Sequence, residues 1–172
     1  MTYKRALVRE PGNSYRRCVS CHPLRDTIDV ERARGQHARY CKTLAELGLE
    51  VIRLPRDDSR PDSCFVEDTA VVHAGKAMIC RMAKDARRGE EDRVEDVLKG
   101  YVEVRRATEP GTLEGGDVIH LPDGLISGVT QRSNREGVKQ MQEWLGARIR
   151  IIEDPSIVHL KSYVTYLSSN IM

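Results

Sequence analysis

Short apolar runs and amphipathic helices recur in the order strand, strand, helix, strand along this 172-residue chain. The interval of the recurrence is about 50–60 residues, which is within the range of repeat architectures. Helical spacing predicts helices at 29–47, 90–98 and 134–145. Period-2 and β-former patterns predict strands at 6–8, 50–54, 65–72, 77–81, 101–105, 116–121, 125–129, 148–152 and 163–167. The pattern predicts an α/β protein built from repeated units.

Composition limits the class of protein that these elements can build. Hydrophobic residues make up 40% of the chain and aromatic residues 5%, so we expect a real but mainly aliphatic core. The 28 basic and 26 acidic residues give a net charge of +2, which supports neither nucleic-acid binding nor membrane binding. No stretch reads as a signal peptide or a membrane span. We therefore expect one domain over residues 1–172 of a cytoplasmic protein whose five cysteines are reduced.

The segment 61–72 places three acidic residues, Asp62, Glu67 and Asp68, within an apolar run. Burying a carboxylate is costly unless a cation or hydrogen-bond donors compensate it. If the segment is extended, Asp62, Cys64 and Asp68 lie on one face and Glu67 on the other. The segment predicts a pocket for a charged group rich in N–H donors, such as a guanidinium or an amine. The alternative is a strand end with solvated acids.

Two later segments carry residue types that fit such a pocket. In 114–117, Glu114 and Asp117 flank two glycines, which have wide backbone freedom and let a ligand approach closely. This segment predicts a pocket wall, with a glycine bulge at a strand start as the alternative. His159 lies between two apolar residues and is a candidate for proton transfer, while a packed core histidine is the more frequent case.

Two arginines, Arg81 and Arg132, lie at or just past the ends of predicted strands. An arginine at such a place can bind a carboxylate with two hydrogen bonds. The alternative for both is a solvated surface residue. The run 81–93 alternates in charge and is interpreted as a solvated loop that leads into the second helix.

The segment 18–22 matches the Cys-x-x-Cys-His pattern of covalent haem attachment. Attachment of that kind requires export, so in the absence of a signal segment we expect no haem. A local metal site would have three candidate ligands there, Cys18, Cys21 and His22, and the sequence leaves that alternative open.

Taken together, these segments resemble the dimethylarginine dimethylaminohydrolase family of the guanidine-modifying (pentein) superfamily. The matching stretches are 61–68, 111–117 and 159–162, with 132–134 before a helix and 36–37 in the first helix. The resemblance implies a pentein-type five-bladed α/β propeller with a central pocket, of which this chain covers about three ββαβ modules. It also implies hydrolysis of a small-molecule arginine derivative, dimethylarginine, to citrulline and dimethylamine, with no metal and no cofactor.

The resemblance implies roles for the candidate residues near the reacting group. His159 is the general acid/base by the family's pattern, and Glu114 and Asp68 grip the guanidinium of the substrate. Two carboxylates suit a guanidinium because its N–H donors are forked in one plane. Glu67 lies in the same motif, with a role that the resemblance leaves open.

At the amino-acid end of the substrate, the resemblance implies that Asp62 holds the α-amino group and that Arg81 and Arg132 hold the carboxylate. Position 161 separates the subfamilies, since arginine and agmatine deiminases carry an aspartate two residues after the histidine and this chain carries Lys161. That difference favours the dimethylarginine hydrolase branch, with another arginine-type deiminase or amidinohydrolase as an alternative.

The nucleophile of the family is a cysteine thiolate near its C-terminus, and none of the five cysteines here matches it. We therefore expect this chain to be the N-terminal portion of a hydrolase, an incomplete propeller domain. A propeller closes only with all its blades, so the expected partner is a second copy of the chain or a complementing C-terminal fragment. A non-catalytic binding protein of the same fold is the alternative function.

Overall fold

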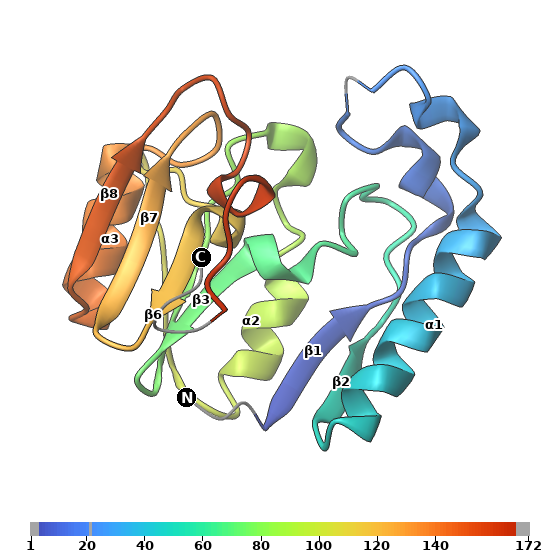
Figure 1. Ribbon diagram of the computed structural model, residues 1–172, viewed down its shortest axis with the longest axis horizontal. Coiled ribbons are helices and arrows are strands. Elements are labelled where there is room, and N and C mark those ends of the chain that lie inside the picture. The colour runs from blue at the N-terminus through green and yellow to red at the C-terminus, as the bar shows by residue number, and fades with distance from the viewer. Residues whose placement is uncertain (1–3, 21, 168–172) are drawn as a thin grey trace. The chain divides into compact units, whose positions relative to one another are not determined.

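The computed structural model describes residues 4–20 and 22–167 (Figure 1). The chain divides into two compact units, Met1–Val66 and Glu67–Met172. Each unit is built from the alternating strands and helices that the sequence predicts, so the α/β class is confirmed. Within the described residues, no helix combines the length and the apolarity that crossing a membrane requires.

The first unit is a strand–helix–strand motif. Strands β1 (Arg5–Arg9) and β2 (Glu50–Leu54) pair in parallel, and helix α1 (Val30–Glu46) connects them. The side chain of Asp29 caps the helix by accepting a hydrogen bond from a backbone N–H of its first turn. The helix ends before Gly48, whose φ of 86° suits a residue without a Cβ. Figure 1 shows α1 running alongside the two strands that it connects.

The second unit contains two successive ββαβ modules. In the first module, strands β3 (Ala70–His73), β4 (Lys76–Ile79) and β5 (Glu103–Arg106) form a sheet, and helix α2 (Asp92–Leu98) connects β4 to β5. The pair β3–β4 is antiparallel, and the pair β4–β5 is parallel.

The second module repeats this arrangement. Strands β6 (Val118–Leu121), β7 (Gly124–Val129) and β8 (Ile149–Glu153) form a sheet, and helix α3 (Arg135–Leu145) connects β7 to β8. Again the first pair is antiparallel and the second is parallel. The identical order and sense of the two sheets confirm the repeat that the sequence predicts.

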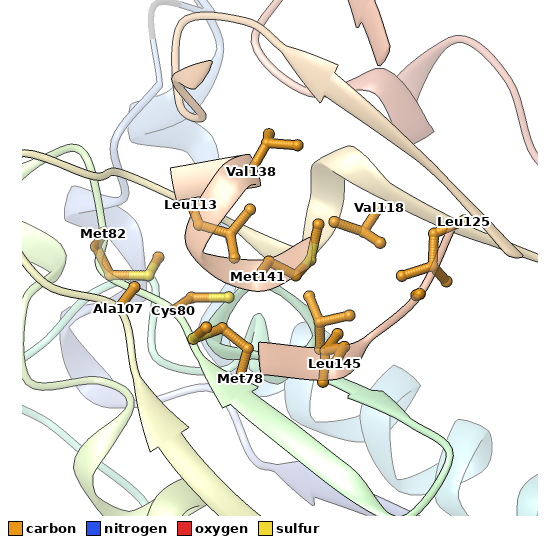
Figure 2. Packing of buried hydrophobic residues seen from close by; sticks show 12 residues of the cluster. Met78, Cys80, Met82, Ala107, Leu113, Val118, Leu125, Val138, Met141 and Leu145 are labelled. Atoms are coloured by element: carbon orange, nitrogen blue, oxygen red, sulfur yellow. The ribbon is translucent and has the colours of Figure 1, made fainter. Parts of the chain in front are cut away.

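The core of the second unit lies between helix α3 and strands of both modules (Figure 2). Met141 and Leu145 of α3 pack with Met78 of β4 and Leu125 of β7. The indole N–H of Trp144, also on α3, donates to the backbone oxygen of Ala77 in β4 at 2.9 Å. The core is richer in sulfur than expected, because Met78, Met82, Met141 and Cys80 lie among its aliphatic side chains. The two modules therefore share one core.

Two expected strands differ in the structure. Residues 65–72 do not form one extended strand, since Val66–Thr69 is a 3-10 helix and the ladder starts only at Ala70. The argument that alternation places Asp62, Cys64 and Asp68 on one face is therefore wrong. The run 163–167 contains no strand, and the 3-10 helix Leu160–Ser162 precedes it.

Candidate active site

Three side chains from separate segments of the second unit meet at one place. Asp68 lies in the 3-10 turn before β3, Glu114 lies just before β6, and His159 follows β8. Asp68 and Glu114 thus both lie ahead of the first strand of their module, Asp68 two residues before β3 (70 − 68) and Glu114 four residues before β6 (118 − 114). One polar atom from each of the three residues lies within 4.8 Å of the others. The fold of the second unit thus brings together acids that are 46 positions apart (114 − 68).

Glu114 and His159 form a hydrogen-bonded pair. His159 Nε2–H donates to Glu114 Oε2 at 2.8 Å, and Asp68 Oδ1 lies 3.9 Å from the same nitrogen. Burial disfavours the charged imidazole, but the hydrogen bond to Glu114 and the charges of Asp68, Glu114 and Asp117 together raise the pKa of His159. The imidazole therefore holds its proton more firmly than an isolated histidine does.

Glu114 itself is fully buried and has donors at both oxygens. Oε1 accepts the backbone N–H of Ala83 at 3.1 Å and lies 3.6 Å from Arg132 Nη1. Oε2 accepts from His159 and from Arg87 Nη1, the latter at 3.3 Å. Burial alone would raise the pKa of Glu114, but the hydrogen bond from His159 and the charges of Arg87 and Arg132 lower it. Glu114 is consequently held as a carboxylate.

Arg87 is the cation at the centre of the site. Its Nη1 donates to Asp68 Oδ2 at 3.0 Å as well as to Glu114, and its Nη2 donates to Glu90 Oε2 at 2.8 Å. Arg87 and Glu90 are 3% and 0% exposed, so the prediction of a solvated loop at 81–93 is wrong there. Charge alternation is typical of solvated loops, but two opposite charges three residues apart can also be buried together as a hydrogen-bonded ion pair.

Asp117 holds the backbone around the Glu114–His159 pair. Its Oδ1 accepts the backbone N–H of Leu160, the residue after His159, at 2.9 Å. Its Oδ2 accepts from the hydroxyls of Ser133 at 2.6 Å and Thr130 at 2.9 Å. Ser133 Oγ in turn accepts the backbone N–H of Glu114 at 3.0 Å. Burial raises the pKa of Asp117, although these donors and the charge of His159 act in the opposite direction.

The two glycines between Glu114 and Asp117 make room for protein atoms. A Cβ on Gly115 would lie 2.0 Å from the backbone oxygen of Glu67. A Cβ on Gly116 would lie 2.6 Å from Asp68 Oδ1 and 2.9 Å from His159 Cγ. The reason for glycine here is therefore the close approach of site residues, whereas the sequence suggested the approach of a ligand.

Asp62 and Glu67, two other predicted site residues, have partners of their own. Asp62 belongs to the first unit, where its carboxylate is buried and accepts the backbone N–H of Val19 at 2.9 Å. Glu67 forms an ion pair with Lys161, the residue that departs from the deiminase pattern.

The two predicted arginines differ in their surroundings. Arg132 is buried beside Glu114, and its Nε and Nη1 have no hydrogen-bond partner within the described residues. Arg81 pairs with Glu109 and donates to the backbone oxygen of Gly111 at 3.4 Å. Arg132 therefore joins the cluster around Glu114, and Arg81 is directed to the 109–111 loop.

Sequence reasoning missed Arg87 and Glu90. The signal that could have found them is the spacing of an arginine and a glutamate with Gly89 between them, which permits a tight turn. Gly89 adopts φ 90°, and the N–H of Glu90 donates to the backbone oxygen of Arg87 at 3.2 Å. Because Arg87 supplies the countercharge for Asp68 and Glu114, we assign no metal centre to this cluster.

The alternative metal site at 18–22 gains no support from the residues that the structure describes. Cys18 is buried, and burial followed by the charge of Asp62 raises the pKa of its thiol, which opposes the thiolate form that binds metals. His22 Nδ1 accepts the backbone N–H of Leu24 at 3.1 Å. Cys21 lies outside the described residues.

Comparison with solved structures defines the class of the fold. The chain superposes on a dimethylarginine dimethylaminohydrolase from Pseudomonas aeruginosa, a cysteine-to-serine mutant complexed with citrulline, with a TM-score of 0.93. That match has 30% identity and covers 99% of this chain and 68% of the solved chain. The N-terminal domain of ArgZ, an arginine dihydrolase, shares the fold at 20% identity with a TM-score of 0.80. The predicted pentein-type α/β fold is thus confirmed.

Comparison of sequences identifies the family. A sequence model described as N,N dimethylarginine dimethylhydrolase, eukaryotic, matches residues 11–168. The chain is 37% identical to an N(G),N(G)-dimethylarginine dimethylaminohydrolase of Streptomyces coelicolor over 97% of its length and 66% of the relative's. It is 31% identical to the Pseudomonas aeruginosa protein of the same description, of which it covers 68%. The chain belongs to the dimethylarginine dimethylaminohydrolase family, and it spans about two thirds of the length of these relatives.

Proposed function

We propose that this chain supplies the guanidinium-binding and proton-transfer residues of a hydrolase that converts dimethylarginine and water to citrulline and dimethylamine. The observation that carries the proposal is the Glu114–His159 pair at 2.8 Å with Asp68 beside it, in a site where both acids are buried. Buried acids held next to a histidine of raised pKa are frequent at catalytic sites. Membership of the dimethylarginine dimethylaminohydrolase family supports the same function.

In this proposal, the guanidinium of the substrate binds to the carboxylates of Asp68 and Glu114. Asp68 and Glu114 stabilise its positive charge, which keeps the central carbon electrophilic. His159 gives its proton to the dimethylamino nitrogen as the bond from that nitrogen to the guanidinium carbon breaks. Once the attacking thiolate has bonded to that carbon and dimethylamine has left, His159 takes a proton from the water that adds to the carbon, and the carbon–sulfur bond breaks to release citrulline and the thiolate. Arg132, beside Glu114, is the proposed partner of the substrate's carboxylate, with Arg81 and Asp62 as the further contacts that the family pattern implies.

The attacking thiolate belongs, in this proposal, to the third of the family's length that lies outside the chain. Cys80, the cysteine beside Asp68 and Glu114, is a poor candidate. Its thiol is buried in the core, and burial together with the charges of Glu114 and Asp68 raises its pKa well above the ordinary value. A thiol that stays protonated at neutral pH is a weak nucleophile.

Citrulline release tests this assignment. The 172-residue chain alone is expected to release none, and a polypeptide extended by the C-terminal third of its family is expected to release citrulline. Mass spectrometry under denaturing conditions establishes which species is assayed, since the chain by itself is 19.5 kDa. In the extended protein, His159→Asn removes turnover. Glu114→Gln tests the site, and Glu46→Gln is its matched control, because the Glu46 side chain is 62% exposed and pairs with Lys42 on helix α1.

One outcome would favour the alternative function. If the extended protein binds dimethylarginine in calorimetry but releases no citrulline, the chain is part of a non-catalytic binding protein of the same fold. Citrulline released by the 172-residue chain alone, and unaffected by His159→Asn, would refute the role proposed for His159.

A further inference from the structure

Two histidines lie where the first strands of the two modules meet. His73 is the last residue of β3, and His120 lies in β6. Their ring centroids are 6.2 Å apart, and the ring planes are inclined by 32°. Figure 1 shows β3 and β6 side by side, and the ring of His120 bonds to the backbone of β3. Neither histidine is a member of the acid–histidine cluster of the candidate active site.

The bond to β3 fixes the tautomer of His120. Its partner is the backbone oxygen of Val72 at 2.9 Å, which can only accept, so Nε2 carries the proton and Nδ1 of the neutral ring keeps a lone pair. Histidines that bind metal ions almost always donate their other ring N–H to a carboxylate, a backbone carbonyl or water. The ring of His120 therefore already has the orientation and the free nitrogen of a metal ligand.

The charge state of His120 agrees with this role. Burial lowers the pKa of His120, and the charges of Lys161 and His73 lower it further, while the bond to Val72 and the charge of Glu67 act in the opposite direction. Because the pKa falls below its ordinary value, the ring is neutral at neutral pH. The neutral imidazole is the form that binds metal ions.

The ring of His73 has a nitrogen whose burial is not compensated. Its Nδ1 is buried and has no hydrogen-bond partner in the part of the chain that the structure describes. Such an atom costs free energy whether it carries a proton or a lone pair. Lys76, opposite His73 in the hairpin, directs its ammonium elsewhere, since it donates to the backbone oxygen of Trp144 at 3.2 Å. A bound cation would supply the missing partner.

The spacing of the two rings suits one ion between them. Bonds from Zn²⁺ to imidazole are about 2.0–2.1 Å long, which places the centroids of two rings on one ion about 5–6.5 Å apart. The observed 6.2 Å lies within that range. Among residues 4–20 and 22–167, no third histidine, cysteine or acid completes a cluster of three around His73 and His120. The other coordination positions of the ion are therefore open to water.

We propose that His73 and His120 bind Zn²⁺ through their Nδ1 atoms and that the ion links β3 of the first module to β6 of the second. The proposal is independent of the hydrolase activity proposed above, because both histidines lie outside the candidate active site. With two protein ligands, the site binds more weakly than the four-ligand sites of structural zinc proteins. An ion that binds the folded chain in preference to the unfolded chain raises its stability.

A Zn²⁺ titration followed by NMR of the imidazole nitrogens tests the site. The Nδ1 signals of His73 and His120 are expected to shift together, with the same dependence on Zn²⁺ concentration, and EDTA should reverse both shifts. His73→Asn should abolish the shift of His120. This variant leaves the bond from His120 to Val72 in place, so it keeps the link between the strands that exists without the ion. His120→Gln removes the other ligand.

His22→Asn and His159→Asn are the matched controls. Each removes one histidine and leaves His73 and His120 unchanged; His22 is exposed in the segment 18–22, and His159 belongs to the candidate active site. The paired shifts should persist in both variants. Zn²⁺ that shifts the signal of His22 or His159 and leaves those of His73 and His120 unchanged would overturn the proposal. So would the absence of any shift at millimolar Zn²⁺.

Thermal unfolding supplies a readout that needs no assignment of signals. At a Zn²⁺ concentration about a hundred times Kd, the Tm of the unchanged chain should rise by about 5–10 °C relative to its value in EDTA. The rise should be absent in His73→Asn and in His120→Gln. An equal rise in these two variants would show that the stabilising ion binds elsewhere, and the proposed link between β3 and β6 would be refuted.

Discussion

Replacing Glu114 by glutamine should lower the pKa of His159, because the variant removes the negative charge that accepts the imidazole proton. The two groups are 2.8 Å apart, and Glu114 is fully buried, so solvent screens their interaction little. A hydrogen bond to a charged group contributes about 1.5–3 kcal/mol. One pKa unit corresponds to about 1.36 kcal/mol, so the expected fall is about 1–2 units.

The positive charges of Arg87 and Arg132 act in the same direction once Glu114 is neutral. Both arginines lie within 3.6 Å of the Glu114 carboxylate, so the variant removes the negative charge that compensates them on this side. Removing one partner of a buried ion pair costs about 3–5 kcal/mol of stability. The same variant should therefore also lower the urea midpoint of unfolding.

The assay is an NMR titration of the imidazole signals of the chain's five histidines. The signal that disappears in His159→Asn identifies His159. Glu46→Gln serves as the control, because Glu46 is 62% exposed and pairs with Lys42 on helix α1. A His159 pKa that rises or stays unchanged in a folded Glu114→Gln variant would show that Glu114 does not hold the proton on this imidazole.

Three further predictions concern stability. Gly137→Ala should destabilise the chain by about 1–3 kcal/mol in urea unfolding, because the added Cβ would lie 2.0 Å from the backbone oxygen of Thr112. A gain in stability would mean that helix propensity outweighs this clash. Asn134→Ala should cost about 2 kcal/mol, because its side chain caps α3 and also accepts the N–H of Thr112 at 3.1 Å; Asn134→Ser should restore part of the loss. The pKa of His159 is raised above 6.5 in the folded state. Protonation of His159 therefore stabilises the fold below pH 6.5, and this contribution is lost as the pH rises through the folded-state pKa. In His159→Gln this part of the pH dependence of stability should disappear.

The sequence by itself determined the order of the elements and predicted the three side chains that the structure brings together. Local signals suffice for this, because a helix cap such as Asn134 or a terminating glycine such as Gly146 acts within a few positions of the chain. Asp68, Glu114 and His159 were also recognisable, since acids and a histidine in apolar surroundings need a specific reason.

Tertiary structure alone decided which of these residues work together. Arg87 and Glu90 read as a solvated charge run in sequence, yet they are buried because Asp68 and Glu114, far away along the chain, complete their hydrogen bonds. Likewise, the sequence predicts that the glycines of 114–117 admit a ligand, whereas their neighbours in the structure are Glu67, Asp68 and His159. Burial, charge compensation and close contact depend on partners distant in sequence, and a local pattern carries no information about them.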